Sequence, residues 1–208
     1  MFIRAMNKIN NNGYNYADLD LPSGTLWATC NVGADKPSDY GLYFQWGDTN
    51  GYTIEQVGKD KQFTWSNYKF NPSGDGDTFT KYASPNDMLE LEDDTAHVNM
   101  GGDWHIPSPD QIQELLDNTT SEWTKQDDVN GMTFTSKKDT SKTIFIPASG
   151  YAWGCSTDFN ETYGNIWSSM LYTYDAGGGQ YLTFNSEVPY FGSKGVRFVG
   201  LPVRGVIG

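Results

Sequence analysis

The chain is poor in cysteine and in positive charge. Its 208 residues include only two cysteines and two histidines. There are 14 lysines and arginines in total, against 26 aspartates and glutamates. Two thiols cannot build a disulfide-dense scaffold, and a chain of this length does not need one. We therefore expect Cys30 and Cys155 to be separate thiols. A formal charge of −12 provides no basic surface for phosphates, so we expect no nucleic-acid partner.

Long apolar runs are also missing. No stretch approaches the ~20 residues of a membrane-spanning helix, and the negative charge disfavours anionic membranes, so we expect no membrane insertion. Residues 1–8 lack the apolar stretch of a signal peptide. We expect either that export uses another route or that the chain is part of something larger.

Aromatic residues and glycine are abundant instead. The chain has 15% aromatic residues and 23 glycines, which indicates a packed core, many turns and little long helix. With no repeat or linker in view, we predict a flexible lead-in over residues 1–15 and a single domain over residues 16–208. The long polar, Gly-rich stretch from residue 49 to 82 must contain loop, and loops of this length are usually functional or tethered.

Two segments carry helix signals. In residues 90–99 carboxylates come early, where they suit the positive end of a helix, and glycines follow. The second helix starts after Ser108 as N-cap with Pro109 in the first position, and it ends near Asn118.

Several short segments read as strands. We predict two strands within residues 16–29 around a turn, an aromatic strand over residues 40–47, and strands near residues 132–135 and 143–147. Further on, Leu182 and Phe184 alternate with Tyr181 and Thr183, as on two faces of a strand. The sequence therefore predicts an α+β fold with two helices and many short, mainly antiparallel strands.

Seven blocks of sequence, in order along the chain, carry a family resemblance. They are LPSGTLWATCNVGA (21–34), YGLYFQWGDT (40–49), LEDDTAHV (91–98), GGDWHIPS (101–108), IFIPASGY (144–151), WSS (167–169) and GLPVR (200–204). Together they resemble C-type-lectin-fold domains of gut bacteria and their phages. These domains belong to the formylglycine-generating-enzyme branch of that fold, which includes the variable proteins of diversity-generating retroelements.

The resemblance implies a C-type lectin-like fold and a display function. In the variable proteins, adenine-directed variation falls between a Trp-Ser-Ser-like anchor and a terminal Gly-x-x-Val-Arg element. The matching segment here is residues 170–198. The resemblance thus implies a surface that binds a protein or glycan receptor on a cell, carried on an extracellular surface or a virion.

The composition of that segment agrees with recognition. Tyr, Ser, Gly and Asn are typical of binding surfaces, because aromatic rings give contact area at low entropic cost. Aromatic residues in loops mark interaction sites more often than cores do. The predicted ligand-binding residues are Trp153, Tyr163, Met170, Leu171, Tyr172, Tyr174, Asp175, Gln180, Tyr190, Phe191, Lys194 and Arg197.

Other residues of the same region are predicted to be scaffold. The tryptophans inside the motif blocks favour a core role, since each would bury a large apolar area; they are Trp27, Trp46, Trp104 and Trp167. Gly177, Gly178 and Gly179 fit a turn between strands.

Catalysis is the first alternative, and the sequence argues against it. The oxidase relative uses a pair of cysteines in its C-terminal half to bind copper, whereas here only Cys155 lies in that half. Copper(I) thiolate chemistry needs at least two converging soft ligands. For His105 we favour a packing or hydrogen-bonding role, and we expect His97 to lie on the surface or in the core of the first helix and not to act as a base. We predict no enzyme activity and no catalytic residues; a formylglycine-generating-type oxidase and a structural adhesin subunit without a variable site stay as alternatives.

Calcium is the one cofactor left open. Many lectin-fold domains bind it through carboxylates and carbonyls. The sequences Asp75-Gly76-Asp77 and Asp93-Asp94 could supply oxygens, but a solvated turn and a helix start explain them as well. We therefore predict no cofactor, with a chelator-induced fall in melting temperature as the sign of bound calcium.

Overall fold

The computed structural model describes residues 8–9 and 12–208. Strands account for 37% of the chain and helices for 11%. The fold is therefore mostly β, and the expected α+β class is wrong. The two predicted helices exist but are short, so the cores are built mainly between small antiparallel sheets and irregular segments.

The first sheet joins the two ends of the chain. It has the order β1-β2-β3-β12, with β1 (Lys8–Ile9), β2 (Asn15–Asp18), β3 (Leu26–Ala28) and β12 (Val206–Ile207). The predicted strand pair within residues 16–29 is confirmed. The lead-in predicted for residues 1–15 falls largely on residues 1–7 and 10–11, which lie outside the described residues, while Lys8 and Ile9 pair with Tyr16 and Asn15.

The second helix, α2 (Pro109–Asn118), forms as predicted. The Ser108 hydroxyl accepts a hydrogen bond from the Gln111 amide, and the Gln111 side chain accepts one from the Ser108 amide. This reciprocal cap satisfies two otherwise unpaired donors and stabilises the helix start. Ile112 and Leu115 face the core.

The first helix is shorter than predicted and broken. A 3₁₀ turn, η2 (Leu91–Asp93), precedes α1 (Thr95–Met100), and Asp94 lies between them. Its carboxylate accepts hydrogen bonds from the amides of His97 and Ile106. Asp94 therefore acts as N-cap, which starts a new helix at the point where the prediction had one continuous element.

A second sheet has the order β4-β5-β6, with β4 (Thr119–Gln126), β5 (Val129–Ser136) and β6 (Thr143–Pro147). β5 and β6 were predicted, whereas β4 was missed because its residues are mostly polar and carry little hydrophobic pattern. The aromatic strand expected over residues 40–47 is wrong. Tyr43 and Phe44 make isolated bridges to Tyr52 and Leu201. Because these two residues pair with two different parts of the chain, no continuous strand forms.

The third sheet carries the C-terminal segment and has the order β11-β10-β9, with β9 (Gly164–Tyr172), β10 (Asp175–Phe184) and β11 (Tyr190–Val196). The predicted alternation in β10 is confirmed, since Leu182 and Phe184 are buried. Glycines 177–179 lie inside β10, so the turn expected there is wrong. A Cβ at Gly179 would lie 2.7 Å from Trp46 Cδ1, which shows that close packing against an indole explains this glycine.

The four tryptophans predicted to be core are all buried, with exposed fractions of 1% or less. Two of them also connect distant segments by hydrogen bonds. Trp46 Nε1 donates to the Ser168 carbonyl and Trp167 Nε1 donates to the Phe44 carbonyl, at 2.9 and 2.8 Å. Buried indoles of this kind contribute both apolar area and a satisfied polar group.

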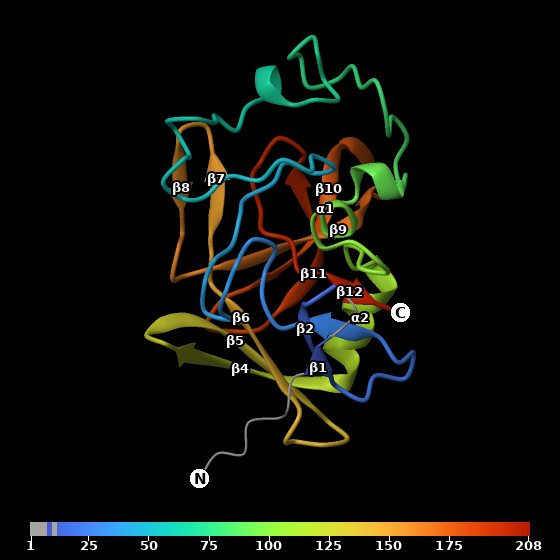
Figure 1. Cartoon of the computed structure of the whole chain (residues 1–208). Helices are drawn as coiled ribbons and strands as arrows, with labels where there is room; N and C mark the ends of the chain where they lie inside the picture. Colours follow the sequence, from blue (N-terminus) through green and yellow to red (C-terminus); the bar gives the residue numbers. More distant parts are fainter. Residues whose placement is uncertain (1–7, 10–11) are drawn as a thin grey trace.

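The two ends of the molecule are built from different elements. In Figure 1 the β4-β5-β6 sheet lies at the bottom, while the β9–β10 turn and the hairpin of β7 (Tyr151–Trp153) and β8 (Ser156–Asp158) point to the top. The long segment that contains the 3₁₀ turn η1 (Trp65–Asn67) crosses above them. No helix in the described part of the chain is long and apolar enough to cross a membrane.

Candidate recognition surface

The predicted ligand-binding residues fall at two separate ends of the third sheet. At one end, Tyr172 of β9 pairs with Asp175 of β10; at the other, Thr183 of β10 pairs with Tyr190 of β11. Asp175 and Thr183 are eight positions apart in β10, which spans roughly 26 Å at about 3.3 Å per residue. One small ligand cannot contact both ends.

Three of the predicted residues belong to the far end. Tyr163 directly precedes β9, and Tyr190 and Phe191 begin β11. Tyr190 is 59% exposed, but Tyr163 packs edge-on against Phe159 with ring centroids 5.5 Å apart. These residues are not part of the surface around the β9–β10 turn.

The β9–β10 turn presents the most exposed aromatic residue of the segment. The Tyr174 side chain is 83% exposed, and its ring lies 5.7 Å from that of Tyr172 in an edge-on arrangement. Asp175 forms an ion pair with Lys194 of β11. The hydrogen bond from Lys194 holds the pKa of the Asp175 carboxyl below its ordinary value, so this carboxyl is ionised at neutral pH. The structure thus brings four of the predicted residues together at this turn: Tyr172, Tyr174, Asp175 and Lys194.

Three predicted contacts are instead buried, and a fourth is half-buried. Leu171 and Arg197 are 0% exposed and Gln180 is 7% exposed. The Gln180 side chain donates to the Leu171 carbonyl at 3.0 Å, so it serves the pairing of β9 with β10. Met170 is half-buried and forms a bridge with Met88. Assigning Leu171, Gln180 and Arg197 to the ligand surface was wrong. β9 and β10 turn Leu171 and Gln180 inward, and Arg197, which follows β11 directly, is buried.

Trp153 lies at the same end as the β9–β10 turn, on the β7–β8 hairpin. Its side chain is 48% exposed, and its ring lies 4.7 Å from Phe198. Phe198 in turn lies 5.0 Å from Trp65, and Trp65 lies 5.7 Å from Phe79. We call these four residues the aromatic row. Only Trp153 was predicted, although Trp65 and Phe79 lie in the long polar stretch that was expected to be functional or tethered.

The aromatic row reaches the β9–β10 turn through the segment of residues 65–82. A Cβ placed on Gly76 would lie 2.8 Å from the Trp65 indole nitrogen, and a Cβ on Gly177 would lie 3.7 Å from the Gly76 carbonyl. Gly177 lies three positions after Tyr174, the last residue of the β9–β10 turn. Residues 65–82 therefore lie between Trp153 and the turn, and we call the three parts together the upper surface.

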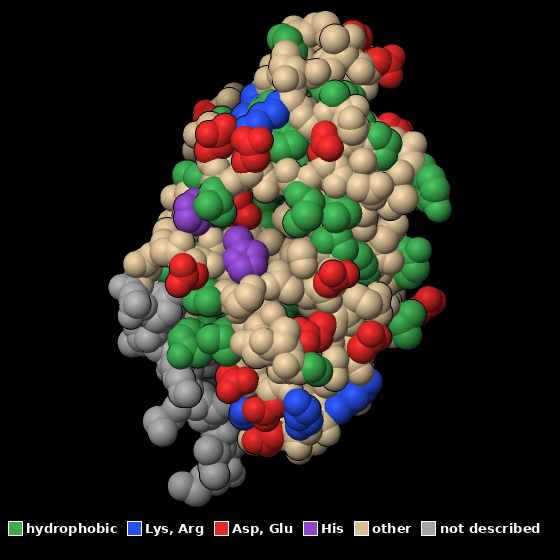
Figure 2. Space-filling view, turned by 90° about the vertical axis from the view of Figure 1, so that its right-hand side faces the viewer, with side chains coloured by type: hydrophobic (Ala, Val, Ile, Leu, Met, Phe, Trp, Pro, Cys, Tyr) green, Lys and Arg blue, Asp and Glu red, His purple; other side chains and the backbone are tan. Residues whose placement is uncertain are grey.

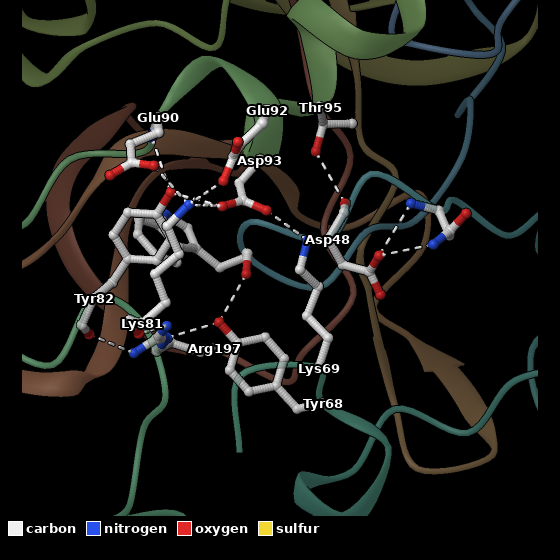
Figure 3. A network of polar contacts seen from close by, with 12 residues as sticks. Asp48, Tyr68, Lys69, Lys81, Tyr82, Glu90, Glu92, Asp93, Thr95 and Arg197 are labelled. Atoms are coloured by element: carbon white, nitrogen blue, oxygen red, sulfur yellow. Dashed lines mark hydrogen bonds and ion pairs between the residues drawn. The ribbon is translucent and has the colours of Figure 1, made fainter. Parts of the chain in front are cut away.

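A buried arginine ties this segment to β10. Figure 3 shows Arg197 between Tyr68 and Tyr82. Its guanidinium donates to the Tyr68 hydroxyl at 2.7 Å and to the carbonyls of Tyr82, Ala176 and Lys81 at 2.8, 3.1 and 3.2 Å. Burial lowers the pKa of Arg197, while the contact with Tyr68 opposes that change. No carboxylate is ion-paired with Arg197 among the described residues.

Aromatic rings surround the same guanidinium. The ring centroids lie 4.3 to 5.8 Å from Arg197 Cζ. Such contacts stabilise a desolvated cation by about 2 kcal/mol or more. Together with the four hydrogen bonds they account for a charged side chain in the core. The rings are those of Phe79, Trp46, Tyr68 and Phe70.

A second group of charged side chains, centred on Asp93, contacts residues 65–82. Asp93 is 6% exposed and accepts hydrogen bonds from Lys69, Lys81 and Tyr82, at 2.6, 2.6 and 2.8 Å. Figure 3 shows the Lys81 ammonium beside the carboxylates of Asp93 and its neighbours. Burial raises the pKa of the Asp93 carboxyl, but the hydrogen bonds from the two lysines and Tyr82 outweigh it and leave the pKa below its ordinary value.

We expect Asp93→Asn to lower the free energy of unfolding by about 1–2 kcal/mol at pH 7, because an amide cannot accept all three charge-assisted contacts. Since the folded-state pKa of Asp93 is depressed, its contribution is present above the ordinary carboxyl pKa of about 3.9 and is lost as the pH falls below it. Urea unfolding of both proteins at pH 7 and pH 3 checks this. A difference that stays constant between the two pH values contradicts it.

Asp75, which was also considered for calcium, has partners within the protein. Asp75 accepts from the amides of Asp77 and Thr78 and from the Asn71 side chain, as in an Asx turn. Among residues 8–9 and 12–208, no three His, Cys, Asp or Glu side chains are arranged to hold a metal ion. Cys30 and Cys155 are both free thiols, as expected.

The two histidines lie on another face of the molecule, shown in Figure 2. They line an open groove of about 550 Å³ together with Leu91, Trp104 and Ile207. The His105 ring nitrogens lie 3.0 Å from the Asp103 carbonyl and 3.2 Å from the Gln111 amide nitrogen. The structural role expected for His105 is therefore confirmed, since both ring nitrogens are engaged by the chain itself.

Comparison of the chain with known protein families, with curated proteins and with solved structures found no match.

Proposed function

We propose that this protein is a ligand-binding display protein of the kind encoded with diversity-generating retroelements. It recognises a protein or glycan on the surface of another cell, and it acts on an extracellular surface or a virion. The motifs from residue 21 to residue 204 support this assignment by resemblance. The proposal concerns recognition and assigns no catalytic residue.

One observation carries the proposal. The most exposed aromatic side chain of the C-terminal segment, Tyr174 at 83%, lies at a turn between two strands whose inward residues are fully buried. Free aromatic rings on a rigid support are what a binding surface requires, because little conformational entropy is lost on contact. Trp153, 48% exposed, adds another ring on the β7–β8 hairpin, which points to the same end of the molecule as the β9–β10 turn (Figure 1).

Binding to intact cells tests the proposal. We expect the labelled protein to bind fixed cells of at least one species in a panel of gut bacteria. The double variant Tyr172→Ala/Tyr174→Ala should bind the same cells about 30-fold more weakly, since truncating aromatic anchors costs about 2 kcal/mol or more. Flow cytometry over a concentration series measures this.

The matched control is Tyr190→Ala, which removes an exposed tyrosine at the far end of the third sheet. It should bind as tightly as the unmodified protein. Equal losses in both variants would show that the β9–β10 turn has no special role, and unchanged binding of the double variant would refute the proposal.

The gene itself offers an independent check. If the segment is diversified, a near-copy of the sequence encoding residues 167–204 lies close by and differs only at adenines, next to a reverse transcriptase gene. Sequencing several isolates should then show changes concentrated in residues 170–198. Uniform conservation of that segment among isolates that differ elsewhere argues against diversification.

A further inference from the structure

The upper surface contains a segment that lies outside residues 170–198. Residues 65–82 carry two members of the aromatic row, and the Gly76 carbonyl lies 3.7 Å from the place that a Cβ on Gly177 of β10 would take. We infer that this segment is a fixed second wall of the recognition surface, and that Arg197 and Lys81 are positioning residues that hold it against the β9–β10 turn. The inference rests on the proposed function.

The contacts of Arg197 show how one side chain can join the two walls. Its Nη1 atom donates both to the Tyr82 carbonyl of the segment and to the Ala176 carbonyl of β10, and Nη2 donates to the Lys81 carbonyl. All three acceptors are backbone atoms. The attachment therefore does not depend on which side chains occupy the turn, so residues of the turn can change without releasing the segment.

Lys81 fixes the segment from the opposite side. Its ammonium lies 2.7 Å from Glu90, 2.7 Å from Glu92 and 2.6 Å from Asp93. Glu90 and Glu92 are well exposed, whereas the Asp93 side chain is 8% exposed. The contact with Asp93 is therefore the one that water screens least, and it anchors residue 81 to the η2 turn beside α1.

Residue 81 thus has two anchors, one through its ammonium and one through its carbonyl. The carbonyl anchor shares Arg197 with Ala176, which precedes Gly177 by one position and follows Asp175 by one. Loss of the contact between the Lys81 ammonium and Asp93 should therefore also increase the mobility of the β9–β10 turn. Two walls held by one guanidinium move together, and this predicts coupled opening of residues 65–82 and 173–177.

The test compares Lys81→Met with Lys142→Met. Both lysine side chains are 27% exposed and both pair with more than one carboxylate, but Lys142 contacts Asp18 and Asp20, far along the chain from the segment. Methionine keeps most of the apolar stem and removes the charge. Hydrogen exchange of backbone amides and binding to the cell panel described above are measured for both variants.

We expect Lys81→Met to accelerate exchange about tenfold in residues 65–82 and also in residues 173–177, because hydrogen bonds to charged groups are lost. Binding to the cells should weaken about tenfold. Lys142→Met should change neither quantity. Faster exchange confined to residues 65–82, or full binding by Lys81→Met, would overturn the inference.

The two proposals fail in different ways. If the unmodified protein binds no cells in the panel, the proposed function fails, and the positioning role of Lys81 and Arg197 is then decided by exchange in residues 173–177 alone. If the unmodified protein binds and Lys81→Met binds equally well, the proposed function stands and the second wall is rejected.

Discussion

Arg197→Met should lower the free energy of unfolding by about 3–5 kcal/mol, because one buried and two partly buried carbonyls lose a charged donor at about 1–3 kcal/mol each. The carbonyls are those of Lys81, Tyr82 and Ala176. Removing the guanidinium also removes its cost of burial, but methionine offers no donor in its place. The loss of hydrogen bonds therefore decides the sign. Urea unfolding at neutral pH measures the change.

Two further variants sharpen the Arg197 experiment. Arg197→Lys keeps the charge but cannot present a planar fork to several acceptors, so we expect it to recover only part of the loss. Lys125→Met on β4 removes an exposed cation and should change stability by no more than about 0.5 kcal/mol. A change below about 1 kcal/mol for Arg197→Met would contradict the role assigned to the guanidinium.

Trp167→Ala should have an effect of similar size, about 3–5 kcal/mol. Trp167 is 1% exposed, and its ring packs edge-on against Tyr181 of β10. Its indole nitrogen donates to the Phe44 carbonyl at 2.8 Å. Truncation leaves both a cavity and an unpaired buried carbonyl, and the two losses add. Thermal and urea unfolding check this prediction.

The comparison with Tyr174→Ala separates scaffold from surface within one segment. Tyr174 is 83% exposed, so its removal should alter the free energy of unfolding by less than about 0.5 kcal/mol. Trp167→Phe should lie between the two, because it keeps a ring and loses the hydrogen bond. If Tyr174→Ala were as destabilising as Trp167→Ala, the turn would be part of the core and could not serve as a free contact surface.

The upper surface combines residues that are expected to vary with residues that are not. The β9–β10 turn belongs to the segment expected to vary, while the aromatic row and residues 65–82 mostly lie outside it. Phe198 is the exception, as the last residue of that segment, and it is only 6% exposed. If side chains vary in the β9–β10 turn while the aromatic row stays constant, the protein can change its specificity and still keep part of its contact area.

Local signals in the sequence were enough for some elements. The start of α2 was predicted from Ser108 and Pro109, because a cap is formed by residues a few positions apart. The inward faces of β10 followed from alternation at Leu182 and Phe184. The burial of the motif tryptophans followed from their size and apolar character.

The α+β class was predicted wrongly because several strands have no local signal in the sequence. Short polar strands such as β4 carry little hydrophobic signal, and they form because a neighbouring strand completes their hydrogen bonds. The glycines of β10 were assigned to a turn because glycine favours turns locally. Their place in a strand depends on Trp46, which is more than 130 positions away in the chain.

The sequence by itself determined which residues are aromatic, which helix is capped and which strand faces are apolar, since these properties depend on neighbours along the chain. Only the tertiary structure decided which of those aromatic residues meet. It placed Tyr163 and Tyr190 about a full strand length from Tyr174, buried Arg197, and brought Trp65 next to Phe198. The reason is that strand register and contacts between distant segments set these distances, and neither is encoded in any short stretch of sequence.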